Sequence, residues 1–573
     1  MILLSMVMCF LWPGSAQDPG YAEPFDVVIN ELMVRPSPSI GLPEAEYVEL
    51  FNRSDKTINL DMWTLSVGNR SRILPRHILG PGGFLLVTHE NNAEDLLEFG
   101  DVAGIPAFPV LAMGGQEVVL RDAEGNVISA IRYSDKWYDS NLKSSGGWSL
   151  EKIDPFNPCG GDNNWTASKD YSGGTPGRVN SVYYSNPDSL LPGLKRAGSI
   201  SGGSSLRLHF SKQMHPLSGW SPADYSAEGL GHPLWVKPSE PFFESVDLYF
   251  DYSFEADTDY TLKVTGNLYD CAGNTIDNNA SETRFTIPVM PGAGDIVINE
   301  LLFNPFPGGF NFIELLNISS STFDMKQLIV AEMENEKPDP AYVLTRESYL
   351  LFPKEYVVLT TDPETVKSHY YTQAPHSFIS MERLPKMNNE SGRVIIADLQ
   401  LNIIDDVKYS SEMHSPVLRD KKGVSLERIN YNRPASDLSN WLSASELAGF
   451  ATPGYKNSQF SDNPDPANNS VGINPKIFSP DNSGNNDVVH IFFDLDKPGY
   501  TGNITIFDSR GRRVRRLIRN EFFGTSGTYS WDGRNDHNSQ SRLGIYIILV
   551  ELFHPEGDIR KYKETVVLGG RLR

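Results

Sequence analysis

The sequence predicts an all-β protein built of several antiparallel β-sandwich domains. Short apolar runs are separated by turn residues, and no segment carries the 3.6-residue hydrophobic period of a long helix. The 48 glycines and 39 prolines supply the turns that many short strands need. At about 150 residues per domain, the 573 residues of the chain correspond to roughly four domains.

Five short landmarks occur twice and in the same order, which predicts that one domain type is repeated. They are an Ile-Asn-Glu-Leu opening, a Val/Ile-Glu-Leu strand, a Leu-Glu-Lys/Arg-Ile run, an Asn-Trp pair and a Thr-Pro-Gly exit followed by Asn-Ser. The first copy carries them from Ile29, Val48, Leu150, Asn164 and Thr175, and the second from Ile298, Ile313, Leu426, Asn440 and Thr452. Each copy spans roughly 160 residues, a usual domain size.

The landmarks within each copy are predicted as strands. In the run 47–52, Val48 and Leu50 are expected to face the core and Glu49 the other side, as in a half-buried strand. Trp165 and Trp441 are expected to fill equivalent core positions. Further apolar strands are predicted at 83–87, 117–120, 356–359 and 394–397.

Two other domains complete the predicted organisation. The middle segment has alternating strands at 206–210, 246–250 and 260–264, and the last has strong strands at 504–507 and 544–550. The predicted division is a signal peptide at 1–16, repeated domains at 24–182 and 293–458, a middle domain at 183–289 and a C-terminal domain at 470–573.

The N-terminus has the features of an export signal. An apolar run at 2–12 is followed by Gly14-Ser15-Ala16, small residues that signal peptidase accepts. We expect cleavage after Ala16 and an exported protein at the cell surface, outside the cell or in the periplasm. A buried N-terminal strand is the alternative. No later segment has the ~20 apolar residues that a membrane-spanning helix needs.

Cleavage leaves two cysteines, Cys159 and Cys271, which lie in different predicted domains. Two interpretations remain open: an interdomain disulfide, which an oxidising compartment favours, or two separate buried thiols. The sequence has no Cys-x-x-Cys motif, which excludes a zinc ribbon and a thioredoxin-like redox motif.

The net charge of −22 is unevenly distributed. From Val471 onward, 15 basic residues face 12 acidic ones, so this part is +3 and the remainder is −25. The acidic body repels nucleic acid and anionic membrane surfaces, so neither is an expected partner. Within the basic part, the residues that could bind an anionic glycan are Arg512, Arg513, Arg515 and Arg516. An exposed strand whose charges discourage edge pairing is the alternative.

The sequence contains none of the common catalytic motifs: no His-Glu-x-x-His, no Gly-x-Ser-x-Gly and no phosphate-binding loop. The repeated landmarks place Glu31 with Glu49 and Glu300 with Glu314 on neighbouring strands. Such pairs can do acid–base chemistry or hold a cation. Their presence in both copies favours a shared structural role, in which they cap backbone groups or pair with arginine. We therefore expect no enzyme and assign no catalytic residue.

One loop carries oxygen side chains at alternate positions: Asp481, Ser483, Asn485 and Asp487. This spacing suits Ca²⁺, which takes roughly 6–8 oxygen ligands. A plain turn between two strands is the alternative. Calcium is the only cofactor for which the sequence offers a candidate site.

The landmarks of the repeated domain resemble those of the lamin tail domain, an immunoglobulin-like sandwich. The middle domain resembles bacterial Ig-like domains through Phe-Ser-x-x-Met at 210–214 and Asp-x-x-Gly-Asn at 270–274. The last domain is similar to Ig-like modules of flagellar hook-capping type and to type IX secretion signals, through Trp531-Asp-Gly and Gly544-Ile-Tyr. It lacks the short Lys-Val-Val-Lys ending of many such signals.

These resemblances imply four tandem immunoglobulin-like β-sandwich domains in a non-catalytic surface or secreted protein. A structural or adhesive role is expected, with a cell-surface protein, a glycan or the type IX secretion machinery as partners. One alternative is an extracellular polysaccharide-binding module that serves a partner enzyme. A hydrolase that uses the repeated carboxylates is another.

Overall fold

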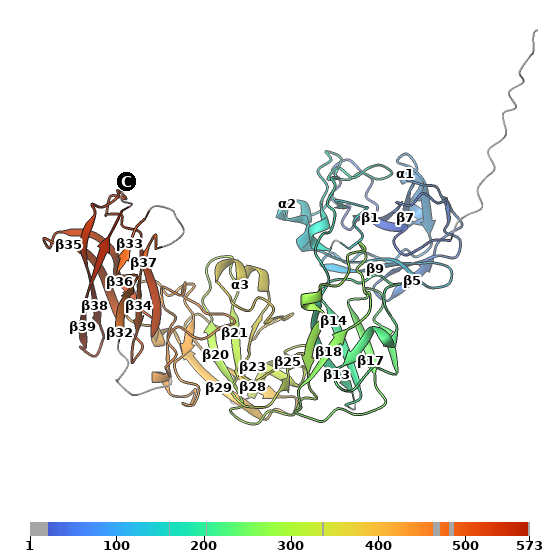
Figure 1. The fold of residues 1–573 in the computed structure, drawn as a ribbon. Coiled ribbons are helices and arrows are strands. Elements are labelled where there is room, and N and C mark those ends of the chain that lie inside the picture. Colours follow the sequence, from blue (N-terminus) through green and yellow to red (C-terminus); the bar gives the residue numbers. More distant parts are fainter. Residues whose placement is uncertain are drawn as a thin grey trace, which may run out of the picture. The chain divides into compact units, whose positions relative to one another are not determined.

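The computed structural model describes residues 21–159, 161–201, 203–334, 337–461, 470–480 and 486–570. The predicted signal peptide therefore lies outside the described residues. Contacts divide the chain into two compact units. The first unit contains the residues up to Phe254 together with Thr258–Phe285, and the second contains Glu255–Asp257 and the chain from Thr286. Figure 1 shows the strands of both units.

The first repeat is a sandwich of a six-stranded and a four-stranded sheet. The larger sheet has the order β12 (Trp165–Ala167), β11 (Leu150–Lys152), β1 (Val27–Met33), β2 (Tyr47–Asn52), β7 (Phe84–His89) and β8 (Val102–Ile105). The smaller sheet has the order β10 (Val127–Ser134), β9 (Gly115–Arg121), β4 (Thr64–Val67) and β5 (Arg70–Ile73). A separate two-stranded sheet is formed by β3 (Ile58–Asn59) and β6 (Ile78–Leu79), which flank β4 and β5 in sequence. The apolar residues that alternate along these strands fill one core.

The second repeat has the same topology. Its six-stranded sheet has the order β31 (Trp441–Ser443), β30 (Leu426–Arg428), β20 (Ile296–Leu302), β21 (Phe312–Asn317), β26 (Tyr356–Thr360) and β27 (Phe378–Ser380). Its four-stranded sheet has the order β29 (Ile403–Ser410), β28 (Ser391–Asp398), β23 (Leu328–Glu334) and β24 (Lys337–Val343). A short pair, β22 (Phe323–Asp324) and β25 (Leu350–Leu351), again accompanies the sheets. The repeated landmarks therefore correspond to a repeated fold.

The middle domain belongs to the first unit and has two small sheets. One is ordered β13 (Leu194–Ser201), β14 (Ser205–Phe210), β17 (Ser245–Tyr249), β16 (Trp235–Pro238), and the other β15 (Tyr225–Ala227), β18 (Tyr260–Val264), β19 (Glu282–Phe285).

The C-terminal domain belongs to the second unit. It pairs a sheet ordered β32 (Ser470–Asn474), β34 (Val489–Asp494), β37 (Ser526–Trp531) with one ordered β33 (Ile477–Phe478), β39 (Ile559–Leu568), β38 (Gly544–Phe553), β35 (Thr501–Asp508), β36 (Arg513–Phe522).

Helices are few and short: α1 (Ala93–Leu96), α2 (Asn141–Ser144) and α3 (Pro363–His369) are the α-helices of the described residues. None of the helices found there is long and apolar enough to cross a membrane. The predicted fold class, an all-β protein of tandem immunoglobulin-like sandwiches, is confirmed.

One expectation about a strand was wrong. Strand β2 is not half-buried, because all six of its residues are buried and Glu49 on its outer side is 0% exposed. The reason lies far away in sequence: the Thr-Pro-Gly exit of the repeat covers the outer face of this sheet and donates a hydrogen bond to Glu49 from Gly177. The same holds for β21 and Glu314 in the second repeat.

Candidate functional sites

Each repeat buries three glutamates side by side on its large sheet. Strand β1 lies between β2 and β11, and in register Glu31 pairs with both Glu49 and Glu151. In the second repeat Glu300 pairs with Glu314 and Glu427. All six side chains are 0% exposed. We call each set of three a glutamate cluster.

The first cluster holds the exit segment that leaves the repeat. Thr175 donates its N–H to Glu31 Oε1 over 2.9 Å and its hydroxyl to Glu151 Oε1 over 2.9 Å. Gly177 donates its N–H to Glu49 Oε2 over 2.6 Å. Buried carboxylates are thus matched to backbone and hydroxyl donors that have no strand partner of their own.

The second cluster repeats this pattern contact by contact. Thr452 donates its N–H to Glu300 Oε1 over 2.8 Å and its hydroxyl to Glu427 Oε1 over 2.8 Å. Gly454 donates its N–H to Glu314 Oε2 over 2.5 Å. Two copies with one arrangement indicate a requirement of the fold.

An asparagine pair completes each cluster. The register of β1 shifts between Ile29 and Glu31, so Asn30 is the extra residue of a bulge. Its amide donates to Glu49 Oε1 over 2.8 Å and to Asn180 Oδ1 over 2.9 Å. Asn180 follows the Thr-Pro-Gly exit, so the bulge ties the end of the repeat to its first strand.

Burial shapes the acidity of these groups. Desolvation, reinforced by repulsion from Glu151, raises the pKa of Glu31 to about 7. Desolvation and repulsion from Glu427 raise the pKa of Glu300 to about 8. The pKa of Glu49 is raised well above its ordinary value by burial and by Glu31. Burial therefore favours the protonated, uncharged form of Glu31, Glu49 and Glu300.

This geometry does not support an acid–base centre. A catalytic carboxylate must reach a substrate, whereas these six have no exposed surface and accept bonds from the exit segment. The sequence found the pairs Glu31 with Glu49 and Glu300 with Glu314, and the structural interpretation that they cap backbone groups agrees with the contacts. It missed Glu151, Glu427 and the two threonines as members, although all of them belong to the repeated landmarks.

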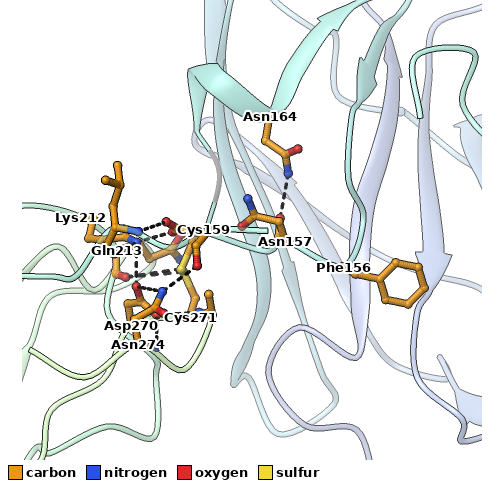
Figure 2. The surroundings of a disulfide bond; sticks show 12 residues. Phe156, Asn157, Cys159, Asn164, Lys212, Gln213, Asp270, Cys271 and Asn274 are labelled. Atoms are coloured by element: carbon orange, nitrogen blue, oxygen red, sulfur yellow. Dashed lines mark hydrogen bonds and ion pairs between the residues drawn. A yellow bond between two sulfur atoms is a disulfide. The ribbon is translucent and has the colours of Figure 1, made fainter. Parts of the chain in front are cut away.

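A disulfide links the first repeat to the middle domain within the first unit (Figure 2). Cys159 and Cys271 are joined across 112 positions of sequence, with their Cα atoms 5.3 Å apart. Beside it, Lys212 forms ion pairs with Asp188 and with Asp270, the latter at 2.7 Å between Nζ and Oδ2. The side chain of Asp270 also accepts the N–H of Ala272 over 2.9 Å and so closes its turn.

The same place holds the one group of metal-ligand type found among the described residues: Cys159, Asp188 and Asp270. It is not a convincing metal centre, because the sulfur of Cys159 is in the disulfide and the ammonium of Lys212 lies between the two carboxylates and forms an ion pair with each of them. This group serves the junction between two domains instead.

The two landmark tryptophans are core residues, as predicted. Trp165 and Trp441 are each 3% exposed and belong to the cores of the first and second repeats. They differ in one contact: Trp441 donates its indole N–H to the carbonyl of Ala435 over 2.9 Å, whereas Trp165 Nε1 has no partner among the described residues. Cys159 occupies the position in the first repeat that Ala435 occupies in the second.

The second repeat also contains a serine–histidine contact, the pairing on which a nucleophilic site would depend. The Nδ1 atom of His414 lies 2.9 Å from Ser443 Oγ. Both residues are buried, and burial lowers the pKa of His414 to about 4. Its Nε2 has no acidic partner among the described residues. A buried pair without an orienting acid and without access for a substrate does not form a catalytic triad.

The candidate calcium loop lies mostly outside the described residues, which include Asp487 but not Asp481, Ser483 or Asn485. Of the arginine run, Arg513, Arg515 and Arg516 lie on β36, an edge strand of its sheet, and Arg512 lies in the turn before it. Arg512 pairs with Asp508 at 2.8 Å, Arg513 with Asp536 at 3.4 Å and Arg515 with Asp532 at 2.9 Å. Those three charges are partly neutralised within the domain. Arg516 Nη and Nε have no carboxylate partner in the described part of the chain.

The second unit has its own junction between domains. The C-terminal domain contacts the exit of the second repeat through the backbone: Thr525 donates its N–H to the carbonyl of Ser458 over 2.8 Å, and Glu446 donates its N–H to that of Phe522 over 3.1 Å. Gln459 adds a side-chain bond to the carbonyl of Phe523 over 3.1 Å. The exit segment that the glutamate cluster fixes is therefore also the platform for the next domain.

Comparison with known proteins gives fold likenesses and one family match. No curated protein matches the chain. Among solved structures it is similar to CopC from Methylosinus trichosporium OB3b, with 14% identity over 18% of this chain and 97% of CopC and a TM-score of 0.14. Dimeric latent PorU from Porphyromonas gingivalis gives 10% identity over 71% of this chain and 35% of PorU, with a TM-score of 0.15. The chain thus spans about a third of the PorU chain.

A DUF4876 family protein from Bacteroides thetaiotaomicron gives 9% identity over 33% of this chain and 78% of that protein, with a TM-score of 0.18. The family match is more specific, and it falls on the strands β1 to β10 of the first repeat. Residues 22–135 match the family model of the Lamin Tail Domain, which confirms the predicted resemblance for this part of the chain.

Proposed function

We propose that the chain is an exported, non-catalytic protein of the cell surface or extracellular space, with a structural or adhesive role. The observation that carries this proposal is that the buried polar residues of both repeats bind other parts of the same chain. The six buried glutamates hold exit segments in place, and they offer no surface to a substrate. A chain that serves mainly to hold its own domains together fits a scaffold better than an enzyme.

The joints between domains support the same proposal. Within the first unit a disulfide ties the first repeat to the middle domain, and within the second unit backbone hydrogen bonds tie the C-terminal domain to Ser458. A protein that carries load or presents a binding surface away from a cell needs joints that resist separation. A covalent bond between domains persists in an oxidising compartment.

We propose the domain division at 24–182, 183–289, 293–458 and 470–573. In this division the segment 293–458 is a second lamin tail domain, because it shares the strand order and the glutamate cluster of the first repeat. The last domain is the part that type IX secretion machinery would engage.

Cell fractionation tests the proposal directly. The full chain and a version ending at Ser461 are expressed in an outer-membrane-bearing host with a type IX system, and surface proteolysis is applied to intact cells. The full chain is expected in the protease-accessible fraction and the shortened chain in the periplasm. Retention of the full chain in the cytosol contradicts export. A broad hydrolase screen in which turnover is lost in Glu31→Gln contradicts the non-catalytic role.

A polysaccharide-binding role is the second candidate, and one feature favours it. Trp235 lies on the edge strand β16, is 45% exposed and stacks on Tyr249 with ring centroids 3.6 Å apart. A flat, partly exposed aromatic pair is the kind of surface on which a sugar ring packs. Binding of neutral glycans on an array that is lost in Trp235→Ala, with an unchanged melting temperature, would favour this role over the structural one.

A further inference from the structure

The C-terminal domain concentrates the basic residues of an acidic chain. It carries a net charge of +3, against −25 for the rest. Four of its arginines lie at one end of the larger sheet, where the turn between β35 and β36 faces the loop that leads into β38. A hollow of about 760 Å³ opens between these two loops.

Positive charge dominates the lining of this hollow. Four arginines line it, Arg510, Arg512, Arg513 and Arg542, against two aspartates. Asp508 pairs with Arg512 and Asp536 with Arg513. In the described part of the chain, the guanidinium groups of Arg510 and Arg542 have no carboxylate partner. Two cations therefore remain for a ligand.

The backbone that carries these arginines is well fixed. The carboxylate of Asp508 accepts the N–H of Arg510 over 2.9 Å and that of Arg512 over 3.0 Å. Across the hollow, Asp536 donates its N–H to the carbonyl of Val514 over 3.0 Å. Preorganised loops lose little conformational freedom when a ligand binds.

The hollow is also at the free end of its domain. The Thr501 end of β35 lies in register with Phe522, which contacts the second repeat. The Asp508 end of the same strand forms the hollow. The hollow and the contact with the second repeat therefore lie at opposite ends of β35.

We propose that this hollow binds an acidic polysaccharide, and that the guanidinium groups of Arg510 and Arg542 form ion pairs with its carboxylate or phosphate groups. Guanidinium matches both oxyanions with two parallel hydrogen bonds. The open, multi-arginine lining suits a polymer that presents several charges. Nucleic acid is disfavoured, because its denser charge is repelled more strongly by the −25 of the remaining chain. This proposal is independent of the structural role.

Binding of the full chain to immobilised polymers tests the proposal. The probes are polygalacturonate for carboxylates, a phosphomannan for phosphates, neutral dextran and single-stranded DNA. At low salt the parent is expected to bind one or both acidic glycans and to release them as salt rises. Arg510→Ala/Arg542→Ala is expected to weaken that binding about tenfold or more. The preferred glycan identifies the oxyanion.

Arg346→Ala is the matched control, since Arg346 is an 84% exposed arginine of the second repeat. It is expected to bind like the parent. Because Arg510 and Arg542 are exposed, the double variant should keep the parent's melting temperature, and this is measured alongside. Equal binding by parent and double variant overturns the proposal. So does a parent that binds neither acidic glycan, or one that binds DNA at least as tightly as the glycans.

Discussion

Glu31 and Glu300 illustrate how a buried acid can stabilise a fold in its neutral form. Glu31 Oε2 lies 3.2 Å from the hydroxyl of Thr175, and that hydroxyl donates its own proton to Glu151. A protonated Glu31 can therefore donate to Thr175, and Glu300 can do the same to Thr452 over 3.1 Å. A glutamine amide has the same shape and donates at the same place.

We predict that Glu31→Gln/Glu300→Gln gains stability relative to the parent as the pH rises. The ordinary pKa of these acids is 4.5, and in the fold it is about 7 for Glu31 and about 8 for Glu300. Raised folded pKa values mean that their contribution is fully present below pH 4.5 and is lost as the pH rises through 7 to 8. Glutamine does not titrate, so the variant escapes this loss.

The measurement is the melting temperature of both proteins from pH 5 to pH 8.5. The difference between variant and parent isolates the two acids, because the buried histidines titrate identically in both. A shift on the order of 5 °C in favour of the variant is expected between the two ends. Glu94→Gln, at an exposed position, should show no such trend. A pH-independent difference would mean that the two acids are already ionised at pH 5.

The two repeats have different basic residues at one equivalent buried position. In the second, Arg428 is 3% exposed and pairs with Asp405 at 2.8 Å. In the first, the corresponding residues are Lys152, which is 2% exposed, and Ser129, whose hydroxyl accepts the N–H of Ile29 as Asp405 accepts that of Ile298. Without the carboxylate, burial lowers the pKa of Lys152 to about 7.

We predict opposite effects for the same substitution at these two positions. Lys152→Met should raise the melting temperature of the first unit, because it removes an amine that the unfolded chain keeps charged below pH 10.5. The gain should be largest below pH 7 and should vanish near pH 10. Arg428→Met should lower the melting temperature of the second unit, since it leaves Asp405 buried and unpaired, at a cost of about 3–5 kcal/mol. Calorimetry of each variant measures these two changes in melting temperature. If both substitutions lower the melting temperature, the Lys152 ammonium has a favourable partner in the fold.

At the scale of elements, the exit segment is as much a part of each repeat as its strands. It donates to the glutamate cluster, covers the outer face of the large sheet and, in the second repeat, supports the next domain. Its turn requires a glycine, because Gly177 has φ +73° and Gly454 has φ +85°. Other residues reach this left-handed region at a cost of roughly 1–2 kcal/mol.

We predict that Gly177→Ala destabilises its repeat more than Gly454→Ala does. At Gly177 a Cβ would overlap the carbonyl oxygen of Phe99, which is backbone and cannot move aside. At Gly454 it would lie 2.7 Å from Thr372 Oγ1, the end of a side chain that can rotate. The transitions of the two units in denaturant measure the difference. Equal losses would mean that the left-handed conformation alone sets the cost.

The strands were predictable from sequence wherever their pattern was local. The strand β18, for instance, has the bounds that the alternation of Tyr260–Val264 indicates. The landmarks also placed the two glutamate pairs on neighbouring strands. Sequence could not show that Glu151 completes the cluster, because β11 pairs with β1 across more than a hundred positions of sequence. The burial of Glu49 depends in the same way on Gly177, 128 positions later.

At the scale of the whole chain, the two units differ in how their domains are joined. The first unit uses a covalent bond, and the second uses backbone hydrogen bonds to Thr525 and Phe522. The first repeat has a cysteine where the second has Ala435, so the covalent joint is a local addition to a shared fold. In the second repeat the carbonyl at this position binds the indole of Trp441, a contact for which Trp165 has no counterpart among the described residues.

We predict that reduction destabilises the first unit alone. A bridge over 112 positions constrains the unfolded chain and is worth at most about 4–5 kcal/mol. Cys159→Ala/Cys271→Ala should lower the first unit's melting transition and leave that of the second unit in place. The substitution at 159 is mild, because alanine is the natural residue at the equivalent position of the second repeat. Loss of stability in this variant reports on the bridge together with the packing of Cys271, which is buried beside Phe25, Val28 and Phe51, whereas reduction of the parent reports on the bridge alone. Thiol counting on the unreduced, denatured protein without residues 1–16 should find no free thiol. Two free thiols in a monomer, together with melting curves that do not respond to reductant, would show that the joint is not covalent.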